Sequence, residues 1–270
     1  MIPAPFEYAA ASSAGHALEL LDRFGEDAKL LAGGHSLLPM MKLRLAAPSA
    51  LVDIGQVGEL SGIRSEAGEL VIGATTCHAD VAASALVRAE APLLAYSAAQ
   101  VGDPQIRHRG TIGGSLAHAD PAADLPMALV ALGGSVEIMG PGGTRTVAAD
   151  DFFTGFFETS LEPGELLSAV RVPRRPDARW GYQKFVRRAN DWAIVGAAAV
   201  AGRVALANMG PVPIRARAVE QALADGASPA EAATLAAEGT EPAEDIHADR
   251  SYRQHLARVL TRRALEDATP

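Results

Sequence analysis

Two glycine-rich segments hold the residues of this sequence that are best suited to bind a ligand. The first reads AGGHS over residues 32–36, and the second reads TIGGS over residues 111–115. Glycine has no Cβ, so it leaves backbone N–H groups bare and permits a positive φ. Bare N–H groups and a serine hydroxyl can bind a polyanion. We therefore predict that the two segments hold one pyrophosphate group between them.

Each segment taken alone is a weak signal, because a double glycine followed by serine is also an ordinary tight turn. The more specific phosphate-binding patterns, G-x-G-x-x-G and G-x-x-x-x-G-K-[ST], do not occur in the sequence. This argues against a Rossmann nucleotide site and against a P-loop. A phosphate group would have to be held in another way.

The composition limits the other classes of function. Lys and Arg number 24 against 32 Asp and Glu, which gives a net charge of −8, and no stretch concentrates cations with aromatic residues. Nucleic acid is therefore a poor candidate partner. The single cysteine, Cys77, cannot form an internal disulfide or supply the thiolates of an iron–sulfur cluster or structural zinc site. Redox chemistry here would require an organic cofactor.

The chain reads as a soluble, cytoplasmic protein. Its amino terminus, MIPAPFEYAAASSAG, lacks a basic region followed by an apolar run, and no stretch of about eighteen residues is free of charge and glycine. The 270 residues, 49% of them hydrophobic, suffice for one large domain or two to three smaller ones.

The elements around the first glycine segment read as β-α-β. Ser12 or Ser13 can cap a helix that ends at Gly25, and KLLAGG reads as a short strand running into a turn. A helix-like run over 37–45, a strand at LVDIG and a hairpin over 60–73 follow.

The rest of the chain predicts mixed helices and strands. We expect helices over 79–86, 92–101 and 121–132, the last with Pro121 in its first turn. Strands are expected at SVEIM, TRTVA and ELLSAVRVP, and then over 181–187, 194–201 and 204–208. The segment from residue 214 onward reads as helical. The pattern indicates an α+β protein with a boundary near PRRPDAR.

Four ordered segments resemble the flavoprotein (medium) subunit of aerobic carbon monoxide dehydrogenase and related molybdenum hydroxylases of the xanthine dehydrogenase type. They are AGGHSLLPMMKLRL, VGDPQIRHRGTIGGSLAHADPAADLP, ELLSAVRVP and YQKFVRRANDWAIVGAAA. The resemblance runs from about Pro3 into the C-terminal segments. It implies an α+β fold with a two-lobed FAD-binding domain of the vanillyl-alcohol-oxidase/PCMH type over 1–176, with lobes of about 1–55 and 56–176. A C-terminal domain with a small antiparallel sheet and helices would cover 177–270.

The resemblance also implies the site. FAD would lie between the lobes and be held noncovalently. The residues that the resemblance assigns to cofactor binding are Ala32, Gly33, Gly34, His35, Ser36, Thr111, Ile112, Gly113, Gly114, Ser115, Asp124, Leu166 and Lys184. It assigns no catalytic residue and no metal ligand to this chain.

Several of these residues have a second interpretation. Asp124 would be favourable in the first turn of a helix even without a ligand. Lys184 is either a solvated strand residue or a positive charge beside the flavin. Trp192 either packs on the flavin ring system or fills the core. For His35 we expect a hydrogen bond that stabilises the loop rather than a covalent bond to flavin, and for His108 and His118 a role in anchoring turns rather than in binding metal.

The function that the resemblance implies is an electron relay. A large molybdenum subunit would oxidise a substrate that it selects itself, a small subunit with [2Fe-2S] clusters would pass the electrons on, and FAD on this chain would deliver them to an external acceptor. The assembly would be a dimer of heterotrimers, and the isolated chain would be inactive on substrate. The alternatives are a standalone FAD-dependent oxidoreductase of the same superfamily and a scaffold that has lost FAD.

Overall fold

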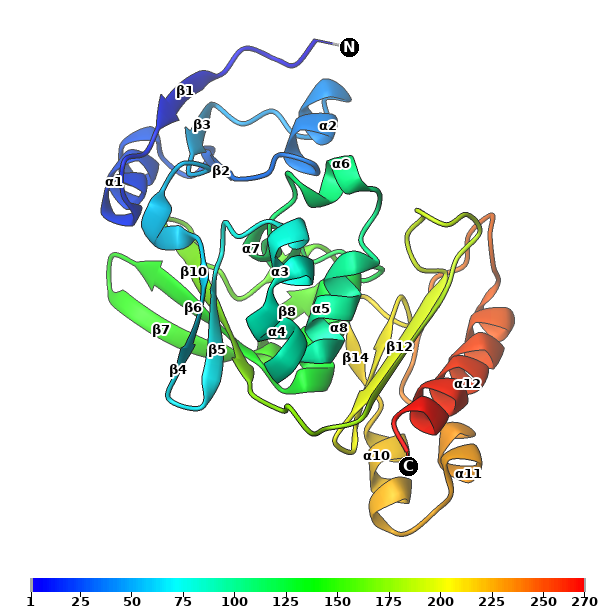
Figure 1. Ribbon diagram of the computed structural model, residues 1–270. Helices are drawn as coiled ribbons and strands as arrows, with labels where there is room; N and C mark the ends of the chain where they lie inside the picture. The colour runs from blue at the N-terminus through cyan, green and yellow to red at the C-terminus, as the bar shows by residue number, and fades with distance from the viewer. Residues whose placement is uncertain (1, 270) are drawn as a thin grey trace.

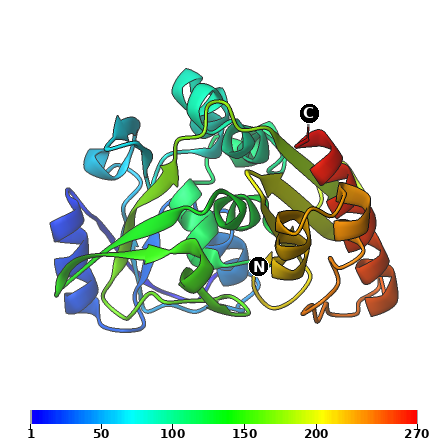
Figure 2. The ribbon, with the colours of Figure 1, turned by 90° about the horizontal axis from the view of Figure 1, so that it is seen from below.

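The computed structural model describes residues 2–269 and contains four sheets (Figure 1). None of the helices in this range is both long enough and apolar enough to span a membrane. Three clusters of buried apolar residues organise the chain: one lies mainly in the N-terminal segment, one in the C-terminal segment, and the largest is shared by the middle segment and one face of the C-terminal sheet. Figure 2 shows the N-terminal helix and the C-terminal helix at opposite ends of the molecule.

The N-terminal lobe is a three-stranded parallel sheet with strand order β1-β3-β2. Its elements are β1 (Glu7–Ala10), α1 (Ala14–Phe24), β2 (Lys29–Leu31), α2 (Leu37–Lys42) and β3 (Ala50–Asp53). The Ser13 hydroxyl accepts a hydrogen bond from His16 N (3.0 Å), and Gly25 ends α1 with a φ of 78°. The cap, the stop and the β-α-β order predicted from sequence are therefore confirmed.

The middle of the chain forms a five-stranded antiparallel sheet, order β4-β5-β10-β6-β7, with helices packed against it. Its strands are β4 (Ile63–Glu66), β5 (Glu69–Gly73), β6 (Ser135–Gly140), β7 (Gly143–Ala148) and β10 (Leu166–Pro173), and β8 (Phe153–Gly155) and β9 (Glu158–Thr159) form a separate hairpin. Its helices are η1 (Gly58–Leu60), α3 (His78–Ala83), α4 (Ala85–Glu90), α5 (Pro92–Ala99), α6 (Pro104–Arg107), α7 (Ile112–His118), α8 (Asp124–Leu132) and α9 (Ala149–Phe152). The predicted hairpin over 60–73 is present as β4 and β5.

Two predicted helices of this region differ from the structure. The helix expected over 79–86 is divided at Ser84, whose hydroxyl accepts from Val87 N and so starts a second helix, α4. The helix expected from Pro121 begins at Asp124, because the Asp120 carboxylate accepts from Ala122 N (2.9 Å) and holds the preceding residues in a turn.

The C-terminal segment is an antiparallel sheet, order β11-β12-β13-β14, with helices against it. Its elements are β11 (Trp180–Phe185), β12 (Val195–Val200), β13 (Arg203–Ala207), β14 (Ile214–Arg215), α10 (Arg217–Ala224), α11 (Pro229–Ala233) and α12 (Arg250–Asp267). Helix α12 packs against β11 and β12 (Figure 1). The predicted α+β class with a small antiparallel C-terminal sheet is confirmed.

Helix α8 joins the two larger parts of the molecule. Every residue of α8 is buried, and the helix contacts α5 and β10 of the middle segment as well as β12 and β13 of the C-terminal sheet. A helix that is apolar on all sides belongs in the interior of a protein. The first residue of this helix, Asp124, is consequently a carboxylate placed at a buried junction.

A glycine fixes how closely α12 approaches the C-terminal sheet. A Cβ at Gly181 in β11 would lie 1.9 Å from the Ala264 carbonyl oxygen in α12, whereas a Cβ at Gly142 would meet nothing within 4 Å. We predict that Gly181→Ala lowers the free energy of unfolding by about 1–3 kcal/mol, since a well-packed interface cannot accept the extra methyl group. Urea unfolding of both variants tests this, with Gly142→Ala as the matched control. Equal midpoints for the two variants would contradict it.

Candidate functional site

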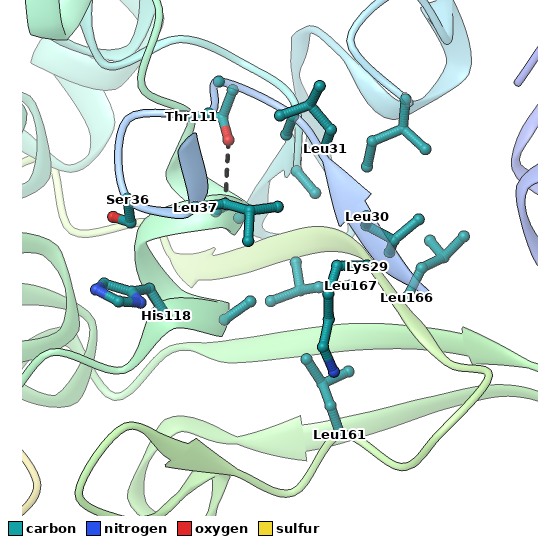
Figure 3. Close-up of a pocket in the computed structure, with 18 of the residues that line it drawn as sticks. Lys29, Leu30, Leu31, Ser36, Leu37, Thr111, His118, Leu161, Leu166 and Leu167 are labelled. Carbon is teal, nitrogen blue, oxygen red and sulfur yellow. Dashed lines mark hydrogen bonds between the residues drawn. The ribbon is translucent and has the colours of Figure 1, made fainter. Parts of the chain in front are cut away.

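A cavity of about 1040 Å³ lies between the N-terminal lobe and the middle segment. It extends from β2 and the end of α1, past both glycine segments, to Asp124 and Trp192. Figure 3 shows Ser36 and His118 on one side of the cavity and Leu30 and Leu161 on the other. The volume is at the upper end of the range for small-molecule and cofactor sites.

The structure brings most of the predicted site residues together around this cavity. Those that line it are Ala32, Gly33, Gly34, His35, Ser36, Thr111, Gly113, Gly114, Ser115, Asp124 and Leu166. Ile112 and Lys184 do not line it. Ile112 is buried in the core of the middle segment, and Lys184 reaches the cavity only through a neighbouring side chain.

The first glycine segment presents unused hydrogen-bond donors to the cavity. Within residues 2–269, the backbone N–H groups of Gly33, Gly34, His35 and Ser36 donate to no other group. Unpaired N–H groups facing a cavity are a preformed site for an anion. Gly34 has a φ of 75°, so the expected positive φ is present at this one position of the segment.

Gly33 is required for a different reason from the one predicted. Its φ is not positive, but a Cβ at this position would lie 2.1 Å from the carbonyl oxygen of Arg109. Arg109 stands two residues before the second glycine segment. The absence of a side chain at Gly33 therefore lets the first segment touch the backbone of Arg109 and Gly110, which leads into the second segment.

The second glycine segment is not a loop, and the expectation of bare N–H groups there is wrong for residues 112–115. Thr111 is the N-cap of α7, and the following residues form the first turn of this helix. Ile112 N donates to Thr76 O (3.0 Å), Gly113 N to Ala74 O (2.8 Å) and Gly114 N to Thr111 Oγ1 (3.1 Å). Thr111 is a preferred N-cap residue type, and it was the signal in the sequence that could have indicated this cap.

Gly113 has a packing role as well. A Cβ on Gly113 would lie 2.5 Å from the Cβ of Ala74, and neither Gly113 nor Gly114 has a positive φ. Gly113 thus allows α7 to lie against Ala74, the residue that follows β5. The groups of this segment that remain available to a ligand are the hydroxyls of Thr111 and Ser115 and the Thr111 N–H, which donates to no group within residues 2–269.

Asp124 is the most buried charged group at the cavity. Its side chain is 3% exposed, and its carboxylate accepts hydrogen bonds from the Tyr182 hydroxyl and from Lys184 Nζ (3.0 Å). Burial raises the pKa of the Asp124 carboxyl above its ordinary value, although Lys184 and Tyr182 both act to lower it. Burial also raises the pKa of Tyr182, together with the nearby carboxylate, so Tyr182 is a neutral donor.

The structure corrects the interpretation of Lys184. Its side chain is 9% exposed and pairs with Asp124, so it is not a solvated strand residue. It extends from β11 in the C-terminal segment and also approaches Gln100 O (3.4 Å). Tyr182, two residues earlier on the same strand, was not predicted, because nothing in the sequence links it to a carboxylate 58 residues away.

Of the three remaining residues considered from the sequence, Trp192 and His118 line the cavity and His108 does not. Trp192 is 55% exposed and lines the cavity, so it does not fill the core. The His118 ring packs against Phe157, with ring centroids 4.9 Å apart. His108 ends α6, and its carbonyl oxygen accepts from Cys77 Sγ (3.5 Å).

His78 lines the cavity and was also not predicted. It is buried, and its Nδ1 atom has no hydrogen-bond partner within residues 2–269. Burial is the main reason that the pKa of His78 falls to about 4, and the neighbouring His35 and Arg107 lower it as well. The imidazole is therefore neutral at physiological pH.

The electrostatics of the cavity favour one way of holding an anion. Lys29 is the only lysine or arginine among the described residues that line the cavity, whereas aspartates and glutamates line it at several points. Backbone N–H groups and hydroxyls must therefore supply most of the positive potential for a bound phosphate.

Comparison with known protein families gives a match over nearly the whole chain. Residues 4–175 match the family described as the FAD binding domain in molybdopterin dehydrogenase. Residues 180–268 match the family described as the CO dehydrogenase flavoprotein C-terminal domain.

Individual relatives align with this chain over nearly its full length. The carbon monoxide dehydrogenase medium chain of Hydrogenophaga pseudoflava is 44% identical, and that of Afipia carboxidovorans is 40% identical; each match covers 99% of this chain and 98% of the relative. A solved structure of carbon monoxide dehydrogenase from Hydrogenophaga pseudoflava, lacking the Mo-pyranopterin moiety, superimposes with a TM-score of 0.96 at 46% identity. It covers 99% of this chain and 98% of the solved chain.

The buried pair of Lys184 and Asp124 leads to a prediction about how the stability of the protein depends on pH. In Lys184→Met the carboxylate loses its cation, so the pKa of Asp124 rises further. A carboxyl group whose pKa is raised by folding binds more protons in the folded state than in the unfolded state. Its contribution to the free energy of unfolding therefore falls as the pH rises above the pKa that the group has in the unfolded chain. We expect a loss of about 3 kcal/mol at pH 8 and a smaller loss at pH 5.

Urea unfolding at both pH values measures this loss. Lys42→Met is the matched control, because Lys42 is exposed at the end of α2. A loss for Lys184→Met that is the same at pH 5 and pH 8 would show that the charge pair is not its cause.

Proposed function

We propose a function from the premise that this chain belongs to the family of FAD-binding medium chains of carbon monoxide dehydrogenase and xanthine dehydrogenase-type enzymes. The chain would be the electron-transfer subunit of a molybdenum hydroxylase complex. It would take electrons from a [2Fe-2S] subunit and pass them to an external acceptor. The observation that supports this most directly is the intact row of unpaired N–H groups from Gly33 to Ser36.

The cavity fits FAD in size and in chemistry. Its volume of about 1040 Å³ can accommodate an extended dinucleotide, and the N–H groups lie between its two ends. Gly33 and Arg109 are in such close backbone contact that a side chain at Gly33 would displace the wall of the cavity. These features argue against a scaffold that has lost its cofactor.

Each part of the site has a role in this proposal. The residues that would hold FAD noncovalently are Ala32, Gly33, Gly34, His35 and Ser36 in the first segment, Thr111, Gly113, Gly114 and Ser115 at α7, and Asp124 and Leu166 beyond it. The N–H groups and hydroxyls would bind the pyrophosphate, and the Asp124 carboxylate would accept hydrogen bonds from cofactor hydroxyl groups. When bound, FAD supplies redox chemistry in which electrons are accepted singly or in pairs.

Two assigned residues act indirectly. Lys184 would hold the Asp124 carboxylate rather than contact FAD, since its Nζ is 3.0 Å from that carboxylate. Ile112 would pack under α7 and fix the first turn of the helix. Trp192 would lie against the flavin end of the cavity, because it lines the cavity and has most of one side free.

Partner subunits follow from what the chain can supply. One cysteine cannot ligate [2Fe-2S] clusters, so the clusters and the molybdenum cofactor would reside on a small and a large subunit. The complex would be a dimer of heterotrimers, and the isolated chain would be inactive on substrate. Two relatives with which this chain aligns are named medium chains, which supports the presence of partner subunits.

We propose the division at residue 176 as the domain boundary. Residues 1–176 would bind FAD, in lobes of about 1–55 and 56–176, and residues 177–270 would form the C-terminal domain. The two matched ranges, 4–175 and 180–268, support this division. The contact between β11 and α8 would then be a contact between domains.

The purified chain is predicted to bind one FAD noncovalently. Acid precipitation should release the yellow colour into the supernatant, and Gly33→Ala should lower the FAD content at least tenfold because its Cβ would displace the Arg109 carbonyl. Gly58→Ala is the control, since a Cβ at Gly58 would meet nothing within 4 Å. Flavin that stays on the denatured chain would point to a covalent bond, and full FAD content in Gly33→Ala would refute the position of the pyrophosphate.

The relay role predicts that flavin reduction depends on partners. Carbon monoxide or hypoxanthine should bleach the flavin in the copurified complex under anaerobic conditions, but not in the isolated FAD-loaded chain. Absorbance near the flavin band follows both reactions. Rapid bleaching of the isolated chain by either compound would contradict the relay and favour a standalone FAD-dependent oxidoreductase.

A further inference from the structure

Tyr182 does not line the cavity, yet its hydroxyl donates a hydrogen bond to Asp124, which does. We infer that Tyr182 is a positioning residue of the cofactor site: its hydroxyl fixes the direction in which the Asp124 carboxylate faces the cavity. The inference rests on the proposed function, because that function assigns Asp124 to the cofactor.

The Asp124 side chain needs a second donor to have one orientation. The terminal torsion of an aspartate is soft, so a carboxylate held by one donor can rotate. Lys184 is a flexible donor on a four-carbon chain, and its Nζ is also 3.4 Å from Gln100 O. Lys184 Nζ lies 3.0 Å from both carboxylate oxygens, so a rigid donor to Oδ1 is what removes the remaining freedom.

Tyr182 is such a rigid donor. Its ring is buried, it pairs with Ala198 across the sheet, and it makes an edge contact with Tyr96 at a centroid distance of 5.4 Å. Burial keeps the hydroxyl protonated, because the ionised form would be costly there. The hydroxyl therefore has one position and one role, that of a donor to Asp124.

Both donors come from one face of one strand. Tyr182 and Lys184 are two residues apart on β11, so both side chains point to the same side of the sheet. That side faces α5 and the start of α8, whereas α12 covers the other. The C-terminal segment thus orients a carboxylate of the cavity without contacting the cavity through either residue.

The test compares Tyr182→Phe with Tyr96→Phe in the full-length chain. Both changes remove one hydroxyl and keep the ring, but the Tyr96 hydroxyl donates to no group within residues 2–269. FAD is removed, and its dissociation constant is measured by titration of flavin fluorescence. We expect Tyr182→Phe to weaken FAD binding about tenfold, as for a hydrogen bond to a charged group, and Tyr96→Phe to leave it within about twofold.

A double-mutant cycle separates positioning from a general effect on packing. In an Asp124→Asn background the carboxylate is gone, so Tyr182→Phe should weaken FAD binding by less than about threefold. A circular dichroism spectrum of the bound flavin at saturation should also change in Tyr182→Phe and not in Tyr96→Phe. Thermal unfolding of each variant confirms that the folded chain is being compared.

Three results would overturn the inference. Equal dissociation constants for Tyr182→Phe and Tyr96→Phe would show that the hydroxyl does not act on the site. An equal effect of Tyr182→Phe with and without Asp124 would show that it acts by another route. Failure of the wild-type chain to bind FAD would refute the proposed function together with this inference, whereas the first two results refute the inference alone.

Discussion

The buried Asp124 carboxylate is the constraint on which the arrangement of this protein depends. A charge that is 3% exposed must be paired and hydrogen-bonded, and its two side-chain partners come from a strand about 60 residues later in the chain. The C-terminal sheet must therefore lie against the first turn of α8 for the charge to be tolerated. Because Asp124 also lines the cavity, the same requirement ties the C-terminal segment to the site.

Under the proposed function the cavity would hold an anion mainly through backbone N–H groups. Few cations line it, and the chain as a whole is acidic, so long-range attraction of a phosphate is weak. Unpaired N–H groups act at short range and only where the backbone is held rigidly. The close contact of Gly33 with Arg109 supplies that rigidity by holding the first segment against the backbone that leads into the second.

The glycines of the two segments have different structural roles. Gly34 supplies a positive φ, while Gly33 and Gly113 allow one stretch of backbone to approach another. Both uses follow from the missing Cβ, but only the first can be expected from the local sequence of a turn. Two of these glycines, Gly33 and Gly113, thus serve close packing rather than flexibility.

The sequence by itself determined the local elements and the family. The Ser13 cap, the hairpin over 60–73 and the two glycine segments are patterns of neighbouring residues, so they were predictable, and four ordered motifs indicated an FAD-binding subunit. The sequence did not predict that Thr111 begins a helix whose N–H groups are already used. Only the tertiary structure decided that Tyr182 and Lys184 hold Asp124, because hydrogen bonds across such separations depend on how the sheets pack, and no local pattern encodes that packing.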